Sequence, residues 1–294
     1  MPVEVIWRAK PLVSHLHAAE AMTHSTPLAD ERLAEALAVP AAHLAAEIRA
    51  ANVPPERFWS HLIPQAANTD NRRQLVQSVT IKTAGSSPRL EAIVSNVSAA
   101  IAAVETAGQA ALPNLADELA LRERPLREQW EARGPGLLQQ LAWLTDEALL
   151  VESCPVWLVH PARGGGGAAH LAYNSVRFEA VLANPHAELP EILRLAWLIA
   201  QLHLDLPLWS EAINPARLPH VARFAMLPAI LAAGEHVELS RLSVDTLRHA
   251  AQAWRLSAPA DIDAPSLVHD WWQTYQASRP PWRVALAALD QLFG

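Results

Sequence analysis

The chain has 294 residues, 51% of them hydrophobic and 18% charged, so it can bury one large or two modest domains and is not a disordered chain. The formal net charge of −7, the presence of only two lysines and the lack of a dense basic cluster exclude a typical nucleic-acid-binding surface. The single cysteine, Cys154, excludes an internal disulfide and a thiolate zinc cluster, and we expect it to be a small buried hydrophobe.

The N-terminal helical region, residues 1–74, is predicted to consist of short helices separated by prolines. Thr26 and Pro27 have the residue types of an N-cap and a first helical turn, and Asp30 follows where the helix dipole favours an acid. Pro54 precedes a further predicted helix. The apolar residues of this region recur at helical spacing, and they include Leu33, Leu37, Leu44, Ile48, Phe58, Trp59 and Leu62.

The first residues, MPVEVIWRAKPLVSHL, include Glu4 and no continuous apolar run, so a signal peptide is not expected. The weakly charged stretch 92–116 contains polar residues and Pro113, and it lacks the sustained apolarity of a membrane span. We therefore expect a soluble cytoplasmic protein with no membrane association.

Residues 75–294 are predicted to form a second, helix-rich α+β domain. The stretch 78–83, SVTIKT, is β-branched and alternates apolar with polar side chains, which predicts a strand. A long helix is predicted from Pro88 to about Thr106. Two further helices are predicted over 114–133 and 136–150, the first broken or kinked at Pro125 because proline lacks the N–H and clashes with the preceding turn.

The stretch 160–170, HPARGGGGAAH, holds four of the ten glycines in one run. It follows a short apolar run of strand length at 156–160, and no lysine or serine follows it at the spacing of a phosphate-binding loop. The run favours a flexible hairpin connection. A mobile flap over a site and an anion-binding loop that uses Arg163 are the alternatives.

Residues 170–182 are interpreted as one bent strand, with a helix from Asn174 as an alternative for the second part. Because strand side chains alternate, Val176 and Phe178 share one face, and Arg177 and Glu179 share the other.

A helix is predicted to begin near Leu189, with Glu191 and Arg194 as an i, i+3 pair. Its stretch 195–204, LAWLIAQLHL, has no charged residue, which predicts a buried helix at the centre of the domain. Further helices are predicted at 218–233, 243–254 (capped by Ser243), 266–276 and 281–292, with a linker at 257–266. The predicted fold class is α+β and predominantly α-helical, with a small sheet and a glycine-rich hairpin packed on the buried central helix.

Five polar residues near the glycine run form the candidate pocket: His160, Arg163, His170, Glu188 and Glu191. The sequence contains no G-x-S-x-G nucleophile elbow. His17, Glu20 and His24 can line one side of a helix and suit zinc, but they match no compact pair of histidines at i, i+4. No metal and no other cofactor is predicted.

The order of predicted elements resembles a zincin-type metallopeptidase domain. The order is strand (78–83), long helix, strand (156–160), glycine hairpin, edge-like strand and central helix. In zincins that helix carries H-E-x-x-H, in which two imidazoles bind zinc and the glutamate acts as a base. Here the corresponding stretch is Trp197-Leu198-Ile199-Ala200-Gln201. The resemblance implies a relic of the fold that has lost its metal.

The leading hypothesis for function is a non-catalytic scaffold or protein-interaction module. It is based on the missing catalytic motifs and on the Trp- and Leu-rich faces. The expected partner is another protein or a second copy, in a homo-oligomer that forms through the C-terminal helices and Trp271-Trp272; nucleic acid is not expected. The alternative is an enzyme of unfamiliar, hydrolase-like type with its site near the 160–170 run.

Overall fold

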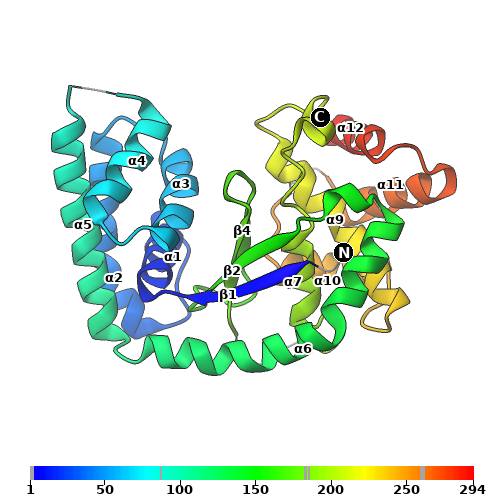
Figure 1. Ribbon diagram of the computed structural model, residues 1–294, viewed down its shortest axis with the longest axis horizontal. Helices are drawn as coiled ribbons and strands as arrows, with labels where there is room; N and C mark the ends of the chain where they lie inside the picture. Colours follow the sequence, from blue (N-terminus) through cyan, green and yellow to red (C-terminus); the bar gives the residue numbers. More distant parts are fainter. Residues whose placement is uncertain (1–2, 87, 182–183, 185, 259–261) are drawn as a thin grey trace.

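A small mixed sheet lies between two helical lobes in the computed structural model, which describes residues 3–86, 88–181, 184, 186–258 and 262–294 (Figure 1). The fold class is α+β and predominantly helical, as predicted. Helices of the N-terminal part cover one face of the sheet, and helices of the C-terminal part cover the other (Figure 1). The molecule is therefore a layered arrangement in which the sheet separates two helical cores.

The four described strands are β1 (Glu4–Ala9), β2 (Ser153–Val159), β3 (Gly167–His170) and β4 (Ser175–Glu179), in the sheet order β1-β2-β4-β3. β1, β2 and β4 run parallel, and β3 is an antiparallel edge strand on β4. No strand was predicted at residues 4–9. β1 forms because Val5, Ile6 and Trp7 pair with Cys154, Pro155 and Val156 of a strand that lies far along the chain.

The prediction that the glycine run is the turn of a hairpin is wrong. The strands on either side of the run, β2 and β3, are not neighbours, because β4 lies between them in the sheet. The hairpin is formed by β3 and β4, and its turn is a short 3-10 segment, Leu171–Tyr173, followed by Asn174 with φ 45°. Asparagine tolerates this left-handed conformation better than most residues, so the chain reverses here and the predicted bent strand is divided. The glycine run instead connects β2 to the edge strand β3.

The N-terminal lobe contains α1 (Pro11–Thr23), α2 (Glu31–Ala50), α3 (Pro55–Asn68), α4 (Arg72–Ala84) and α5 (Leu90–Ala111). The predicted apolar positions Leu33, Leu37, Leu44 and Ile48 are buried along α2, which packs closely on α5. Asp30, and not Thr26, is the N-cap of α2, because its carboxylate accepts a hydrogen bond from Leu33 N. Residue 74 lies inside α4, so helices from both predicted regions share this lobe.

The predicted strand 78–83 is wrong, because these residues belong to α4. Asn71 caps the helix by accepting a hydrogen bond from Gln74 N. Val76, Val79, Thr80 and Thr83 are buried at helical spacing. Packing of this face outweighs the β preference of the individual residues.

α5 is long and apolar enough by length and composition to cross a bilayer. The core helix of a folded protein passes the same test, and here Val94, Val97, Ile101 and Val104 are buried.

α6 (Leu115–Leu144) is one continuous helix that contains Pro125. Two helices were predicted here, over 114–133 and 136–150, with a break or kink of the first at Pro125. Ion pairs at i, i+4 spacing, such as Arg124–Glu128 and Arg127–Glu131, lie along its exposed side. The helix runs beneath both lobes and then bends upward beside the C-terminal lobe (Figure 1). The sequence Gly134-Pro135-Gly136 contains the residue types that bend helices.

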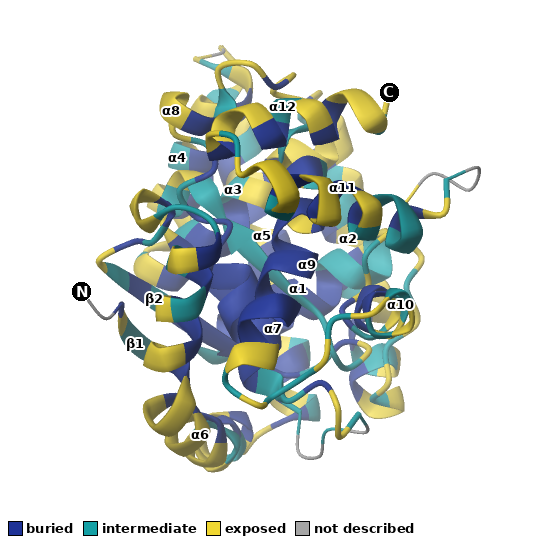
Figure 2. Ribbon diagram, turned by 90° about the vertical axis from the view of Figure 1, so that its right-hand side faces the viewer, coloured by how far each residue is buried: buried dark blue, intermediate teal, exposed yellow. Residues whose placement is uncertain are grey.

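The C-terminal lobe contains α7 (Glu191–Ile199), α8 (Pro207–Ser210), α9 (Leu218–His236), α10 (Val244–Ala253), α11 (Ala264–Ser278) and α12 (Trp282–Leu292). α7 is buried at the centre, as predicted, and α9 lies beside it (Figure 2). A Cβ at Gly167 would lie 2.7 Å from Leu198 Cδ1, so β3 packs directly on α7. Trp271 and Trp272 are buried in an aromatic cluster with Tyr275 and Trp282, so they pack within this lobe.

Candidate functional site

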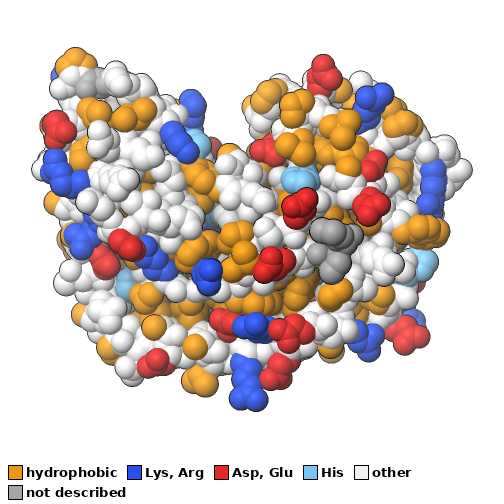
Figure 3. Space-filling model, in the orientation of Figure 1, with side chains coloured by type: hydrophobic (Ala, Val, Ile, Leu, Met, Phe, Trp, Pro, Cys, Tyr) orange, Lys and Arg blue, Asp and Glu red, His pale blue; other side chains and the backbone are white. Residues whose placement is uncertain are grey.

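A deep notch separates the two lobes (Figure 3). The turn of the β3–β4 hairpin rises between the lobes (Figure 1). Tyr173 in this turn is fastened to the N-terminal lobe, because its hydroxyl is 2.7 Å from His61 Nδ1 and accepts a hydrogen bond from Gln65 Nε2 at 2.9 Å. Lys82 Nζ lies 4.8 Å from the centre of the Tyr173 ring. We call this notch the interlobe cleft.

The two faces of β4 differ in chemistry, as the alternation predicted. Phe178 points to the C-terminal lobe, where the guanidinium of Arg194 lies 3.9 Å from its ring centre. Arg177 and Glu179 point to α1 in the N-terminal lobe. The apolar face is therefore joined to the C-terminal core, and the polar face meets the N-terminal lobe through charged groups.

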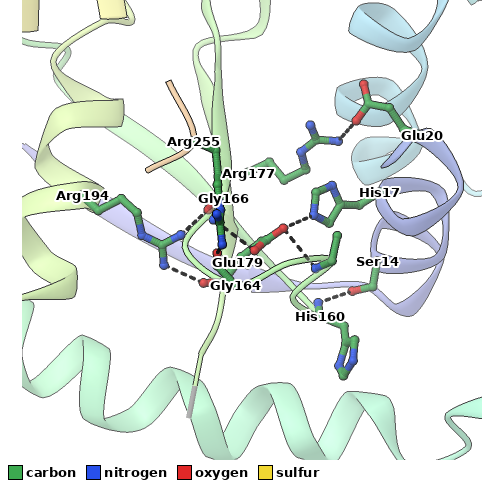
Figure 4. A network of polar contacts seen from close by, with 11 residues as sticks. Ser14, His17, Glu20, His160, Gly164, Gly166, Arg177, Glu179, Arg194 and Arg255 are labelled. Carbon is green, nitrogen blue, oxygen red and sulfur yellow. Dashed lines mark hydrogen bonds and ion pairs between the residues drawn. The ribbon is translucent and has the colours of Figure 1, made fainter. Parts of the chain in front are cut away.

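α1 presents a matching polar face, because Ser14, His17 and Glu20 are three residues apart and lie on one side of the helix. His17 Nε2 is 2.8 Å from Glu179 Oε1, and Arg177 Nη1 donates to Glu20 Oε2 at 2.6 Å. Figure 4 shows these pairs along the contact between α1 and β4. We call the five residues Ser14, His17, Glu20, Arg177 and Glu179 the polar seam.

Glu179 also holds the glycine loop, residues 161–166. Its two carboxylate oxygens accept hydrogen bonds from Ala162 N and Gly166 N, each at 3.0 Å (Figure 4). Burial alone would raise the pKa of Glu179, but the hydrogen bond and charge of His17, the Gly166 N–H and the charge of Arg194 lower it to about 2. The side chain is therefore an ionised anchor for the loop.

Arg194 of α7 fixes the same loop from the other side. Its guanidinium donates to the carbonyls of Gly166 and, at 2.8 Å, of Glu179, and it also pairs with Glu191 as predicted. The side chain is fully buried, so these contacts satisfy a charge that would otherwise be costly. Both ends of the glycine loop are thus fixed by charged side chains.

The Glu20–Arg177 pair lies at one end of the seam (Figure 4). Burial would raise the pKa of Glu20, but the charges of Arg177 and His17 lower it overall. Three polar atoms around this pair have no hydrogen-bond partner among the described residues: His17 Nδ1, His170 Nε2 and Arg177 Nε. Buried polar atoms without a partner are uncommon, so they mark a place where a bound group or water completes the site.

Arg223 of α9 faces this pair from the C-terminal lobe. Its side chain is exposed to solvent. Desolvation by the surrounding protein, followed by the charge of Arg177, nevertheless lowers the pKa of Arg223, and the charge of Glu20 acts in the opposite direction. In the described parts of the chain no acid forms an ion pair with it. Because Arg177 is paired with Glu20, Arg223 adds a positive charge beside that pair.

The predicted pocket residues do not all come together. The backbone N–H of His160 donates to Ser14 Oγ, and the ring lies 3.6 Å from Asp30. His170 is beside Arg177, and burial followed by the charges of Arg177 and His17 lowers its pKa well below the usual range. Glu188 lies 3.6 Å from His249 Nδ1. Arg163 and Glu191 line one cavity, in which neither His160 nor His170 takes part.

The sequence interpretation missed the roles of Arg177, Glu179, Arg194 and Arg223. His17 and Glu20 were grouped correctly on one helix face, and both bind side chains of β4. Within the described residues, no group of three or more His, Cys, Asp or Glu side chains is arranged to hold a metal ion. One signal was available in the sequence: charged and apolar residues alternate along β4. This alternation indicates a strand with one polar face, which here is buried.

Cys154 is fully buried, as predicted. Burial raises the pKa of its thiol to about 12, so it is protonated at neutral pH and is a poor nucleophile.

No protein-family model, no curated protein and no solved structure matches this chain.

Proposed function

We propose that this chain is a protein-interaction module that holds an acidic segment of a partner protein in the interlobe cleft. The observation that carries the proposal is Arg223, which is exposed, lies within electrostatic reach of the Glu20–Arg177 pair and has no ion-pair partner among the residues described. A carboxylate from a partner would supply the missing charge.

Other cations lie around the same cleft. On the N-terminal side, Lys82 lies against Tyr173, and burial followed by the charges of Lys82 and Arg57 lowers the pKa of His61. On the C-terminal side, burial and then the charge of Arg223 lower the pKa of His220. Lys82 and Arg57 in the N-terminal lobe and Arg223 in the C-terminal lobe therefore supply positive charge, although the whole chain has a formal net charge of −7. These cations favour an acidic ligand and a salt-sensitive association.

The residues at the end of α7 support the proposal of an interaction module that is not an enzyme. Trp197, Leu198, Ile199, Ala200 and Gln201 occupy the stretch where a zincin would carry H-E-x-x-H, and all five are buried. The resemblance to a zincin relic remains a proposal. The resemblance is supported by the chain order of an antiparallel edge strand, β3, then β4 and then α7. It is weakened at residues 78–83, because the strand predicted there is a helix.

The proposal is tested with a fluorescently labelled, glutamate-rich peptide and a glutamine-rich peptide of equal length, by fluorescence anisotropy. The glutamate-rich peptide is expected to bind, and Arg223→Gln is expected to weaken that binding about fivefold because one charge contact is lost. Arg32→Gln is the matched control, since Arg32 is an exposed helical arginine at the start of α2.

Equal binding of the two peptides, or a similar loss in Arg223→Gln and Arg32→Gln, contradicts a charge-selective site in the cleft.

An enzyme remains the second candidate, on one observation. Arg163 and Glu191 line the same cavity together with His186 and His249. Glu191 is already paired with Arg194, so the imidazoles are the groups that would move a proton there.

A further inference from the structure

We propose that the glycine loop and the C-terminal end of α10 form a second site, which binds the oxyanion group of a small organic molecule. The site lies apart from the interlobe cleft and does not depend on the proposed protein partner. The oxyanion is a phosphate or a carboxylate, and it is carried by a compact apolar body.

The cavity has the size of a small-molecule site. Its volume is about 440 Å³, and it lies between the glycine loop, the segment around Leu189 and the end of α10. Cavities of roughly 300–1,000 Å³ typically receive such ligands. It is lined by Arg163, Gly164, Gly165, Val181, Asn184, His186, Leu189, Glu191, His249, Gln252, Ala253, Trp254 and Arg255.

The charge of the cavity favours an anion. Arg163 forms no hydrogen bond or ion pair with any residue that the structure describes, and Arg255 has only a long contact, 3.4 Å, to the carbonyl of Gly164. Of the acids nearby, Glu191 pairs with Arg194, and Glu188 lies 3.6 Å from His249 Nδ1. Two guanidinium groups are therefore left for a ligand, and guanidinium binds carboxylate and phosphate with paired hydrogen bonds.

The backbone of the loop adds donors. Ala162 N and Gly166 N donate to Glu179, whereas Gly164 N and Gly165 N donate to no acceptor within the described part of the chain. The loop is thus anchored on both sides, and its central N–H groups have no acceptor among the residues that the structure describes. Unpaired backbone N–H groups beside guanidinium groups are the donors that oxyanion sites use.

Glycine is required for this arrangement. Gly164 and Gly165 both have φ of 81°, a conformation that residues with a Cβ rarely adopt. A Cβ at Gly165 would lie 2.3 Å from the carbonyl oxygen of Ala253, so only glycine lets the loop approach the end of α10. This approach brings Arg163 and Arg255 into one cavity.

The rest of the lining is mixed, and its apolar side chains can contact the body of the ligand beside Asn184, His186, His249 and Gln252. Val181, Leu189 and Ala253 line the cavity together with Trp254, whose ring centre is 5.2 Å from that of Trp197. Trp254 is mostly buried, and the contact with Trp197 holds it in place. A molecule with a charged head and a small aromatic or aliphatic body matches both parts of the cavity.

The test is isothermal titration of the full chain with three probes of similar size: phenyl phosphate, benzoate and the neutral benzamide. We expect one equivalent of phenyl phosphate or benzoate to bind, with the stronger of the two identifying the oxyanion, and benzamide not to bind. Arg163→Gln and Arg255→Gln are each expected to weaken binding about tenfold. Arg283→Gln, an exposed arginine near the start of α12, is the matched control.

Failure of both anions to bind overturns the proposal, and so does equal binding to the wild type and to Arg163→Gln and Arg255→Gln. Arg223→Gln is included to separate the two sites, since it should leave titration of these probes unchanged while it weakens binding of the acidic peptide. Circular dichroism of each variant shows that a loss of binding is not a loss of fold.

Discussion

His15 is a fully buried histidine with neither ring nitrogen hydrogen-bonded to a described residue. Its ring fills the space beside Gly108, where a Cβ would lie 2.4 Å from His15 Cδ2. Burial, followed by the charge of His160, lowers the pKa of His15 from 6.5 to about 4. The folded protein therefore keeps this imidazole neutral over a range in which the unfolded chain protonates it.

This difference predicts a loss of stability in weak acid. Between pH 6.5 and pH 4 the unfolded state binds the proton on His15 and the folded state does not, so the free energy of unfolding falls as the pH falls, by at most about 1.4 kcal/mol per pH unit. His15→Leu removes this group and is expected to flatten the dependence in that window, as measured by urea unfolding at a series of pH values. His43→Leu, at an exposed position on α2, should keep the wild-type slope. The same slope in wild type and His15→Leu would show that His15 does not set it.

At the residue scale, sequence reasoning found the polar face of α1 but not its partner. Helical spacing alone places His17 and Glu20 together, and strand alternation alone places Arg177 and Glu179 together. That these two faces meet depends on the packing of segments about 160 residues apart, which no local pattern encodes. The metal alternative arose because His17 and Glu20 were considered without Arg177 and Glu179.

At the scale of elements, the connection between β2 and β3 is held by specific contacts at both ends and at its centre. Glu179 and Arg194 hold the start and end of the glycine loop, and α10 packs against its centre at Gly165. Four glycines in a run predicted flexibility, but here they allow close approach of backbone to backbone.

Substitution of two glycines distinguishes these roles. Gly165→Ala is expected to lower the free energy of unfolding by about 2 kcal/mol, because φ is positive and the Cβ would clash with Ala253 O. Gly136→Ala, inside α6 where a Cβ would meet no atom within 4 Å, is expected to raise it by about 0.5–1 kcal/mol through helix propensity. Urea unfolding of both variants checks the pair. A stable Gly165→Ala would mean that the loop moves away from α10 at little cost.

The elements that sequence reasoning predicted well are those with strong local patterns. The buried α7 follows from a long uncharged stretch, and Ser243 caps α10 as predicted because its hydroxyl accepts from Thr246 N. α4 was mistaken for a strand, since its β-branched residues fit a helix only once their buried face is known. The β3–β4 turn was missed because Asn174 is a single weak turn residue.

At the scale of the whole molecule, the two lobes hold the sheet by different means. The C-terminal lobe is packed on the apolar face of β4, while the N-terminal lobe is attached to its polar face through the polar seam. The seam also contains the Glu20–Arg177 pair, whose charges act on Arg223, so the attachment of the lobes and the charge around Arg223 involve the same residues.

Loss of one seam charge is expected to weaken the whole fold. Glu179→Gln leaves the buried Arg194 and His17 with less compensation and should lower the free energy of unfolding by about 3 kcal/mol. Glu131→Gln, which removes an exposed ion pair of α6, should leave stability nearly unchanged. Chemical denaturation measures both, and similar small effects would show that the seam is not a main attachment of the lobes.

The pairing of β1 with β2 has a consequence for synthesis on the ribosome. The helices α2 to α5 can pack on one another as they emerge, but Glu4–Ala9 has no neighbouring strand until Ser153–Val159 has been made. At roughly 5–20 residues per second this interval is on the order of ten seconds. During it Val5, Ile6 and Trp7 stay without their sheet partners, so the unpaired backbone of this segment is open to association with another chain.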